Sequence, residues 1–148
     1  MGRLIYVTPA SLDGFIGDGD YSWSAPNEEV MAALNADLAE VDTYLYGRRT
    51  YETMAVWETE PAVAEQSPEA AAFAATWQGA DKVVFSSTLP QVHTRRTRLE
   101  RQLDARVVDE TKAASRGDLT IGGSTLAAEA MRLDLVDAVE LLLSLIHI

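Results

Sequence analysis

The sequence predicts an α/β protein with one domain and a largely parallel sheet. The chain has 148 residues, which is a common size for one domain with its own core. Segments with the pattern of buried strands alternate with segments whose apolar residues follow helical spacing, and this order is typical of parallel sheets. In two places a strand pattern leads through glycine directly into the start of a helix. We find no internal repeat, low-complexity segment or linker.

In the first half of the chain, a buried strand, a long glycine-rich loop and a helix are followed by a second strand and helix. Asn27 is the expected N-cap of the first helix, and two glutamates in the first turn suit its dipole. The apolar positions of that helix are Val30, Ala33, Leu34, Leu38 and Val41. The expected segments are strand 3–9, loop 11–26, helix 27–40, strand 41–47 and a helix that begins at 48.

The second half continues this alternation. An alanine-rich helix precedes the buried strand DKVVFS, and a strand ending in two glycines leads to a helix opened by Ser124. Residues 89–116 mix short strand and helix patterns and are not assigned. The expected segments are helix 67–77, strand 81–86, strand 118–123, helix 124–133 and strand 136–143.

Composition excludes several classes of function. A net charge of −11 argues against binding nucleic acid, because a phosphate backbone requires a basic face. The absence of cysteine excludes disulfides and thiolate metal ligands, and we expect no metal site. No apolar run is long enough to span a membrane, and the N-terminus lacks a signal-peptide pattern. The expected location is the cytoplasm.

The basic residues are gathered in two places. Arg48 and Arg49 form one focus, and five of the twelve basic residues form the other. Such islands on an acidic protein are able to bind a small anionic ligand. For the second group, however, a solvated surface is the favoured interpretation, since charge runs are usually surface. Its members are Arg95, Arg96, Arg98, Arg101 and Arg106.

Three strand ends carry residues suited to an anion. Glycines before a helix let a phosphate approach free backbone N–H groups, and arginines supply charge-assisted hydrogen bonds. Each segment also has an ordinary explanation: a tight turn for the glycines, helix capping and solubility for the arginines, and a hydroxyl-rich turn for the third. The G-x-G-x-x-G pattern is absent. The segments are Gly122–Thr125 (Gly122, Gly123, Ser124, Thr125), Gly47–Thr50 (Gly47, Arg48, Arg49, Thr50) and Ser86–Thr88 (Ser86, Ser87, Thr88).

Four motifs in this order, SLDGFIG, YLYGRRTYETM, KVVFSSTL and DLTIGGSTLAAEAMRLDLVD, resemble those of the bacterial dihydrofolate-reductase family. The similar proteins are those grouped with the C-terminal reductase domain of the riboflavin-pathway deaminase-reductase (RibD). The resemblance covers residues 1–143 and implies a three-layer α/β/α fold with a mostly parallel sheet. It also implies a reductase that binds NADPH and acts on a small pteridine or pyrimidine-type substrate. One form would be 5-amino-6-(5-phosphoribosylamino)uracil reductase activity in riboflavin biosynthesis.

The same resemblance implies residue roles. Gly47 to Thr50 would meet the cofactor phosphates, Ser86 to Thr88 would lie near the adenosine 2′-phosphate, and Gly122 to Thr125 would hold the pyrophosphate. The SLDGFIG loop would close over the nicotinamide, with Asp13 as the candidate catalytic residue that orients or protonates the substrate. An Asp-Gly turn is the alternative for Asp13. The implied substrate contacts are Ser11, Asp13, Gly14 and Trp23.

The sequence departs from the family pattern at several points. Ser87 replaces the usual arginine of the F-S-x-T turn, which leaves the preference for NADPH over NADH open, and Pro9 replaces a small residue. Related proteins continue with a further antiparallel strand, whereas residues 143–148, LSLIHI, resemble a translated sequencing adapter. We therefore expect a truncated domain with a non-native tail and low solubility.

Two kinds of function remain open. One is the NADPH-dependent reductase, and the other is a non-catalytic nucleotide-binding or dimer-forming protein on the same fold. A proton donor beside the nicotinamide would discriminate between them. A small-molecule substrate is the expected partner, and the sequence does not decide whether a homodimer forms.

Overall fold

A computed structural model describes residues 2–11 and 27–144 of the chain. The loop expected at residues 11–26 lies outside these residues except for Ser11, which is the last residue of the first strand. The tail expected at residues 143–148 is described only as far as Ser144. Within the described part, no helix is long and apolar enough to cross a membrane.

The described residues contain one six-stranded sheet in which every neighbouring pair of strands is parallel. The strand order is β4-β3-β2-β5-β1-β6, so β2 and β5 occupy the centre and β4 and β6 lie at the edges. Parallel strands all end at the same edge of the sheet. The strands are β1 (Leu4–Ser11), β2 (Val41–Gly47), β3 (Asp81–Phe85), β4 (Thr97–Glu100), β5 (Asp118–Gly122) and β6 (Ala138–Ser144).

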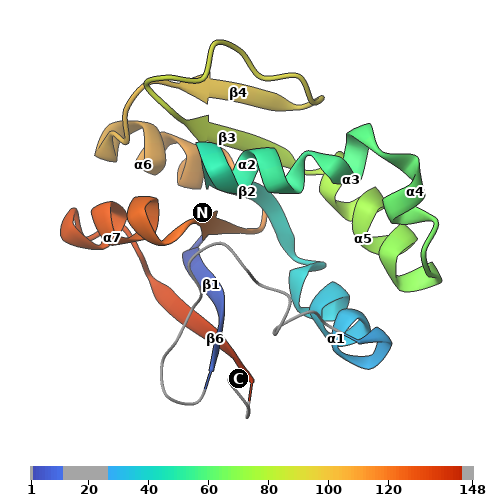
Figure 1. The fold of residues 1–148 in the computed structure, drawn as a ribbon. Coiled ribbons are helices and arrows are strands. Elements are labelled where there is room, and N and C mark those ends of the chain that lie inside the picture. Colours follow the sequence, from blue (N-terminus) through green and yellow to red (C-terminus); the bar gives the residue numbers. More distant parts are fainter. Residues whose placement is uncertain (1, 12–26, 145–148) are drawn as a thin grey trace.

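Helices cover both faces of this sheet, which confirms the three-layer α/β prediction (Figure 1). The helices α6 and α7 pack on one face, and α1, α2, α3 and α5 pack on the other. The helices are α1 (Glu28–Leu38), α2 (Arg48–Met54), α3 (Val56–Thr59), α4 (Pro61–Ala64), α5 (Pro68–Gly79), α6 (Ala105–Ala114) and α7 (Ser124–Arg132).

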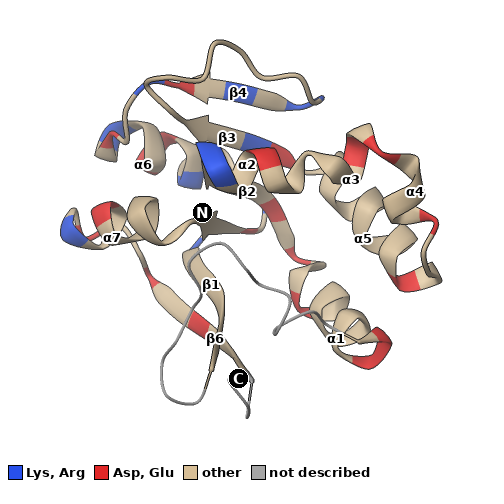
Figure 2. Cartoon of the chain, in the orientation of Figure 1, with Lys and Arg blue, Asp and Glu red and all other residues tan. Residues whose placement is uncertain are grey.

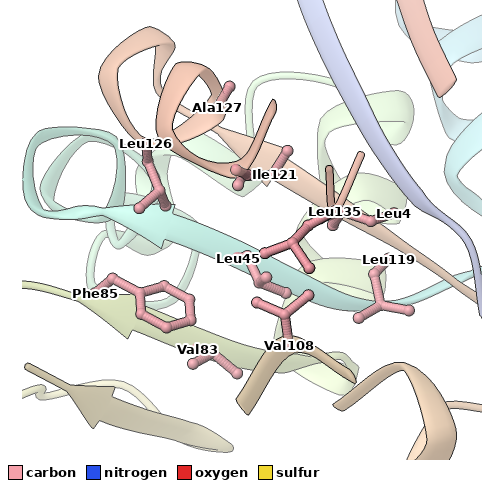
Figure 3. Packing of buried hydrophobic residues seen from close by; sticks show 11 residues of the cluster. Leu4, Leu45, Val83, Phe85, Val108, Leu119, Ile121, Leu126, Ala127 and Leu135 are labelled. Atoms are coloured by element: carbon pink, nitrogen blue, oxygen red, sulfur yellow. The ribbon is translucent and has the colours of Figure 1, made fainter. Parts of the chain in front are cut away.

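The core beneath α6 and α7 consists mainly of aliphatic side chains, with the ring of Phe85 among them (Figure 3). Leu45 and Leu119, on the central strands, are fully buried, and Val108 of α6 packs against them without solvent exposure. Alternation along a strand sends every second side chain to this face. The spacing of these residues therefore fixes which face α6 and α7 cover.

The core on the opposite face is aromatic. Trp77 of α5 is fully buried, and its indole Nε1 donates a hydrogen bond to the Tyr46 hydroxyl at 2.9 Å. Lys82 is 1% exposed, and its Nζ donates to the carbonyls of Trp77 and Ala80 at 2.9 Å each. These carbonyls end α5, where a cation is favourable. Burial lowers the pKa of Lys82 to about 8.

Two local expectations change. Asn27 caps α1 as predicted, with its Oδ1 accepting from the backbone of Val30 at 2.9 Å, but Val30 itself is 44% exposed. Val41 belongs to β2 rather than to the apolar face of the helix. The helix α7 begins at Ser124, as predicted, and Gly123, with a positive φ of 99°, is its N-cap. The unassigned region contains β4 and α6.

A hydrogen-bonded ion pair joins α6 to the start of β1 and to the segment before β6. The Lys112 ammonium lies 2.7 Å from Oδ2 of Asp137 and also donates to the Leu135 carbonyl at 2.7 Å. The same carboxylate oxygen accepts from the backbone of Leu4 at 2.8 Å. The hydrogen bond from Lys112 holds the pKa of Asp137 below its usual value. This carboxylate therefore stabilises the fold most when it is charged.

We expect Asp137→Asn to lower the free energy of unfolding at pH 7 by about 1–2 kcal/mol, because the charge-assisted bonds are lost. The native pKa of Asp137 is depressed, so its contribution is complete above the unfolded pKa of about 4 and is lost as the pH falls further. Urea denaturation at several pH values measures the difference between variant and wild type, which should shrink below about pH 4. Asp109→Asn, an exposed carboxyl on α6, is the control; an equal effect there would contradict the prediction.

The outer edge of the sheet carries an apolar row. Val139, Leu141 and Leu143 alternate along β6 and are 52%, 54% and 56% exposed. In the described residues β6 pairs only with β1, so its other side offers unpaired backbone groups. An exposed apolar edge strand favours pairing with another chain. The low solubility expected from the sequence stays a prediction.

Leu141→Lys should reduce self-association of the purified protein, because a charge on an edge strand opposes strand pairing between molecules. Light scattering and sedimentation velocity against protein concentration measure this effect. Val30→Lys adds the same charge at a comparably exposed apolar residue away from the edge. If both variants reduce association equally, the edge is not its cause.

Candidate functional site

The three segments singled out from the sequence meet at the carboxyl edge of the sheet. β2 lies between β3 and β5, with Gly47 paired to Phe85 and Tyr46 paired to Gly122. Residues that follow these three strands therefore emerge side by side. In open α/β sheets, ligands bind outside the carboxyl ends of the strands. Segments more than seventy residues apart in the sequence thus form one candidate site.

The arginines at the start of α2 differ in how they are held. Arg48 is exposed; its Nε donates to Glu52 at 2.9 Å and its Nη1 donates to the Thr88 hydroxyl at 3.0 Å. Arg49 is also exposed, and its side chain makes no hydrogen bond or ion pair with the described residues. In Figure 2 the first turn of α2 is blue, whereas the charged residues of α3 and of the segments on either side of α4 are red. Arg48 therefore joins two of the three segments, and Arg49 remains available to an anion.

A buried tyrosine fixes the position of α2. Tyr51 is fully buried, and its hydroxyl accepts from the backbone of His93 at 3.0 Å. It also lies 3.0 Å from the Thr94 hydroxyl. These contacts tie the helix to the segment between β3 and β4. The arginines one turn earlier are therefore carried on a rigid support.

The hydroxyls after β3 have different roles. Ser86 is 9% exposed, and its Oγ accepts from the backbone of Thr88 at 3.2 Å and of Leu89 at 3.0 Å. This hydroxyl therefore closes the turn from inside. Ser87 and Thr88 are exposed. Of the three predicted contacts, these two face outward, while Ser86 shapes the turn.

The two glycines after β5 pack against α2. A Cβ on Gly122 would lie 3.0 Å from Cγ2 of Thr50 and 3.1 Å from Cδ1 of Tyr46. At Gly123, with φ of 99°, a Cβ would meet the Thr50 hydroxyl at 3.0 Å. Side-chain capping is absent at the start of α7, so its first backbone N–H groups have no side-chain acceptor there. Thr50 thus links the Gly47–Thr50 segment to the Gly122–Thr125 segment, and the glycines have a packing role as well as suitability for an anion.

Arg101 is a member of this edge that the sequence analysis left among surface charges. It follows directly after β4, whose last residue, Glu100, is paired with Phe85. Its Nη1 donates to the carbonyls of Ser86 at 3.3 Å and Leu89 at 2.6 Å. Strand spacing does not reveal this contact, because β4 is short and its segment has no clear pattern. The signal in the sequence that could have pointed to Arg101 was its place in a cluster of arginines that follows the strand expected at residues 81–86.

The other arginines of that cluster are surface ion pairs, as the sequence favoured. Each lies within 4 Å of an acidic side chain and is at least half exposed. Such pairs contribute little to stability. The pairs are Arg95–Glu58 at 3.3 Å, Arg96–Asp81 at 2.9 Å, Arg98–Glu100 at 3.5 Å and Arg106–Glu110 at 3.9 Å.

Two cavities lined by described residues lie away from this edge. One of 590 Å³ is at the amino ends of β3 and β4, and one of 260 Å³ is beside Arg3 and Asp118. The larger is big enough for a small ligand. However, the charges of Arg96 and Arg98 at its wall are already paired with Asp81, Thr111 and Glu100. The carboxyl edge, with unpaired cations and free N–H groups, is the better candidate site.

Comparison with known proteins identifies a solved structure of similar fold. No protein-family model matches the chain, and no curated protein matches its sequence. Among solved structures, the chain is similar to a protein from Shewanella sp. PV-4 provisionally named a riboflavin biosynthesis protein. The TM-score is 0.70 and the sequence identity is 22%, over 98% of this chain and 78% of that protein. This chain has a dihydrofolate-reductase-like α/β fold. At that identity the likeness concerns the fold, and the chemistry must be argued from the site.

The predicted substrate contacts are only partly located. Ser11 is 1% exposed and ends β1, so it lies at the same carboxyl edge, beyond β5 from Gly47. Asp13, Gly14 and Trp23 lie outside the described residues. The roles expected for them stay predictions.

The glycines of the site should respond differently to substitution. Gly123→Ala forces a side chain into a positive-φ conformation and against Thr50, and should lower the free energy of unfolding by about 1–3 kcal/mol. Gly47→Ala should cost at most about 1 kcal/mol, because φ is −76° and the nearest atom to a new Cβ is 3.9 Å away. Urea denaturation of both variants measures this contrast. Equal losses would contradict the described packing.

Proposed function

We propose that the chain is an NADPH-dependent reductase of the dihydrofolate-reductase and RibD C-terminal family. Its substrate is a small pteridine or pyrimidine-type heterocycle. The observation that carries the proposal is the convergence of Gly47–Thr50, Ser86–Thr88 and Gly122–Thr125 at one carboxyl edge. The four-motif resemblance assigns these same segments to the cofactor. Fold, motifs and position therefore favour one function.

The donors at this edge suit a dinucleotide with several phosphates. Arg49 has an unpaired guanidinium and Arg48 is half exposed beside it. The start of α7 presents backbone N–H groups next to Gly122 and Gly123, where the helix dipole favours an anion. On a chain of net charge −11, such a local excess of donors requires a specific reason. Phosphate binding supplies one.

Gly47 gives the most specific test of fit. Its backbone conformation is open to any residue, and a Cβ would meet nothing closer than 3.9 Å in the described structure. Packing therefore does not require glycine there, in contrast to Gly123. A close approach of the cofactor to the main chain explains the missing side chain. We infer that a Cβ at residue 47 would occupy space used by the ligand.

In this proposal each segment has one task. Arg48 and Arg49 bind phosphate oxygens, the Gly122–Thr125 segment holds the pyrophosphate, and Ser87 and Thr88 contact the 2′-phosphate. NADPH supplies the hydride when bound, so the chain needs no nucleophile of its own. The protein has to hold the reacting groups in position and deliver a proton. Asp13 is the proposed group for orienting or protonating the substrate.

The substrate class is proposed more broadly than the cofactor. The solved structure of similar fold is provisionally named for riboflavin biosynthesis. This name and the resemblance support a phosphoribosylamino-pyrimidine as the first substrate to examine, followed by dihydropteridines. Oxidation of NADPH followed by absorbance, with each candidate substrate, tests the choice.

We expect the purified chain to bind NADPH with saturation, and more tightly than NADH, as measured by quenching of its tryptophan fluorescence. Arg48→Ala and Arg49→Ala should each weaken NADPH binding about tenfold or more, because a charge-assisted hydrogen bond is lost. Gly47→Ala should weaken binding of both cofactors while leaving the urea midpoint nearly unchanged.

Arg106→Ala is the matched control for the loss of one positive charge, because Arg106 is an exposed residue of α6 paired with Glu110. It should leave binding unchanged. No saturable binding of either cofactor to folded wild-type protein would overturn the reductase proposal and favour a non-catalytic role. Binding that Gly47→Ala does not affect would contradict the proposed approach of the ligand.

A further inference from the structure

We propose that Arg101 is the specificity-determining residue that makes the turn after β3 a binding site for a phosphate monoester. This inference rests on the proposed cofactor and deepens it, because it assigns the preference for NADPH over NADH to a residue outside the recognised motifs.

Arg101 holds the turn that carries Ser87 and Thr88. Its Nη1 donates to the carbonyls of Ser86 at 3.3 Å and Leu89 at 2.6 Å, which are the two ends of the turn. Ser86 Oγ closes the same turn from inside. The guanidinium is therefore fixed in place by two acceptors on the turn itself. A fixed cation loses little conformational entropy when it binds an anion.

The remaining donors of Arg101 are available. In the described structure, Nε and Nη2 of this exposed side chain make no hydrogen bond, and no acidic side chain pairs with it. The other arginines of its cluster all have acidic partners. Of the five, Arg101 alone therefore contributes uncompensated positive charge, and it does so at the carboxyl edge of the sheet.

A second guanidinium reaches the same turn from the opposite side. Arg48, on α2, donates from Nη1 to the Thr88 hydroxyl at 3.0 Å. Its charge is shared with Glu52 at 2.9 Å, whereas Arg101 has no such partner. The exposed hydroxyls of Ser87 and Thr88 lie on the turn that both arginines contact. Two guanidinium groups and two hydroxyls suit a phosphate monoester, which offers three strong acceptor oxygens and close to two negative charges.

The arginines therefore have different roles in the proposed cofactor site. Arg49, at the start of α2, serves phosphates common to both cofactors, whereas Arg48 also contacts the turn after β3 through Thr88. Arg101 follows the edge strand β4, two strands out from β2, and its contacts place it beside a group bound at the turn after β3. A cofactor that lacks the 2′-phosphate leaves Arg101 without a ligand. Substitution of Arg101 should therefore change selectivity more than overall binding.

The test compares Arg101→Gln, Arg101→Lys and wild type by fluorescence titration with NADPH and with NADH. Glutamine keeps an amide N–H group that is able to donate to the turn carbonyls but removes the charge. We expect Arg101→Gln to weaken NADPH binding about tenfold or more and to leave NADH binding within about twofold, while Arg101→Lys retains most of the preference. Arg106→Gln, which removes the same charge from a nearby surface pair, should change neither cofactor.

The outcomes separate this inference from the function on which it rests. If wild type binds neither cofactor, the proposed function fails and the selectivity assignment fails with it. If wild type prefers NADPH and Arg101→Gln behaves like Arg106→Gln, only the assignment to Arg101 is overturned. If Arg101→Gln weakens both cofactors equally, Arg101 supports the turn without selecting the phosphate, and the proposal is likewise wrong.

Discussion

The pairing of β2 with β3 on one side and β5 on the other is the constraint on which the candidate site depends. Because all three strands are parallel, this pairing brings Gly47, Phe85 and Gly122 to one edge of the sheet. The segments that follow these strands are far apart along the chain. They meet through short-range interactions only after the strands are in register: Arg48 with Thr88, and Thr50 with the two glycines of β5. A register shift in β2 would turn its side chains to the other face and disperse the site.

Charge on this protein has to be considered locally. The chain carries a net charge of −11, yet its positive groups are not equivalent. Most arginines after β3 are held by acidic neighbours and contribute little beyond a solvated surface. Arg49 and Arg101 lack such neighbours in the described residues; Arg49 follows the central strand β2, and Arg101 follows the edge strand β4. In the proposed function, anion binding therefore depends on which cations remain unpaired, not on the total charge.

The glycines of the candidate site occur at their positions for different physical reasons. Gly123 is required by its backbone, since φ is 99°, and Gly122 is required by the close contact with Thr50 and Tyr46. Gly47 is required by neither. Gly47 is the N-cap of α2, a position that favours glycine over alanine, and in the proposed function its missing side chain also leaves room for the cofactor.

Local patterns in the sequence determined the elements: the alternation of strands and helices, the Asn27 cap, and the three strand ends with anion-suited residues. These follow from short-range rules of spacing, capping and turn chemistry. The elements between residues 89 and 116 could not be assigned from the sequence, because β4 is four residues long and packs at an edge, where the pattern of burial is weak. Only the tertiary structure decided that the strand ends are neighbours, that Ser86 faces into its turn, and that Arg101 is separate from the other surface arginines. Those facts depend on strand order and on contacts between distant residues, and spacing along the chain carries no information about either.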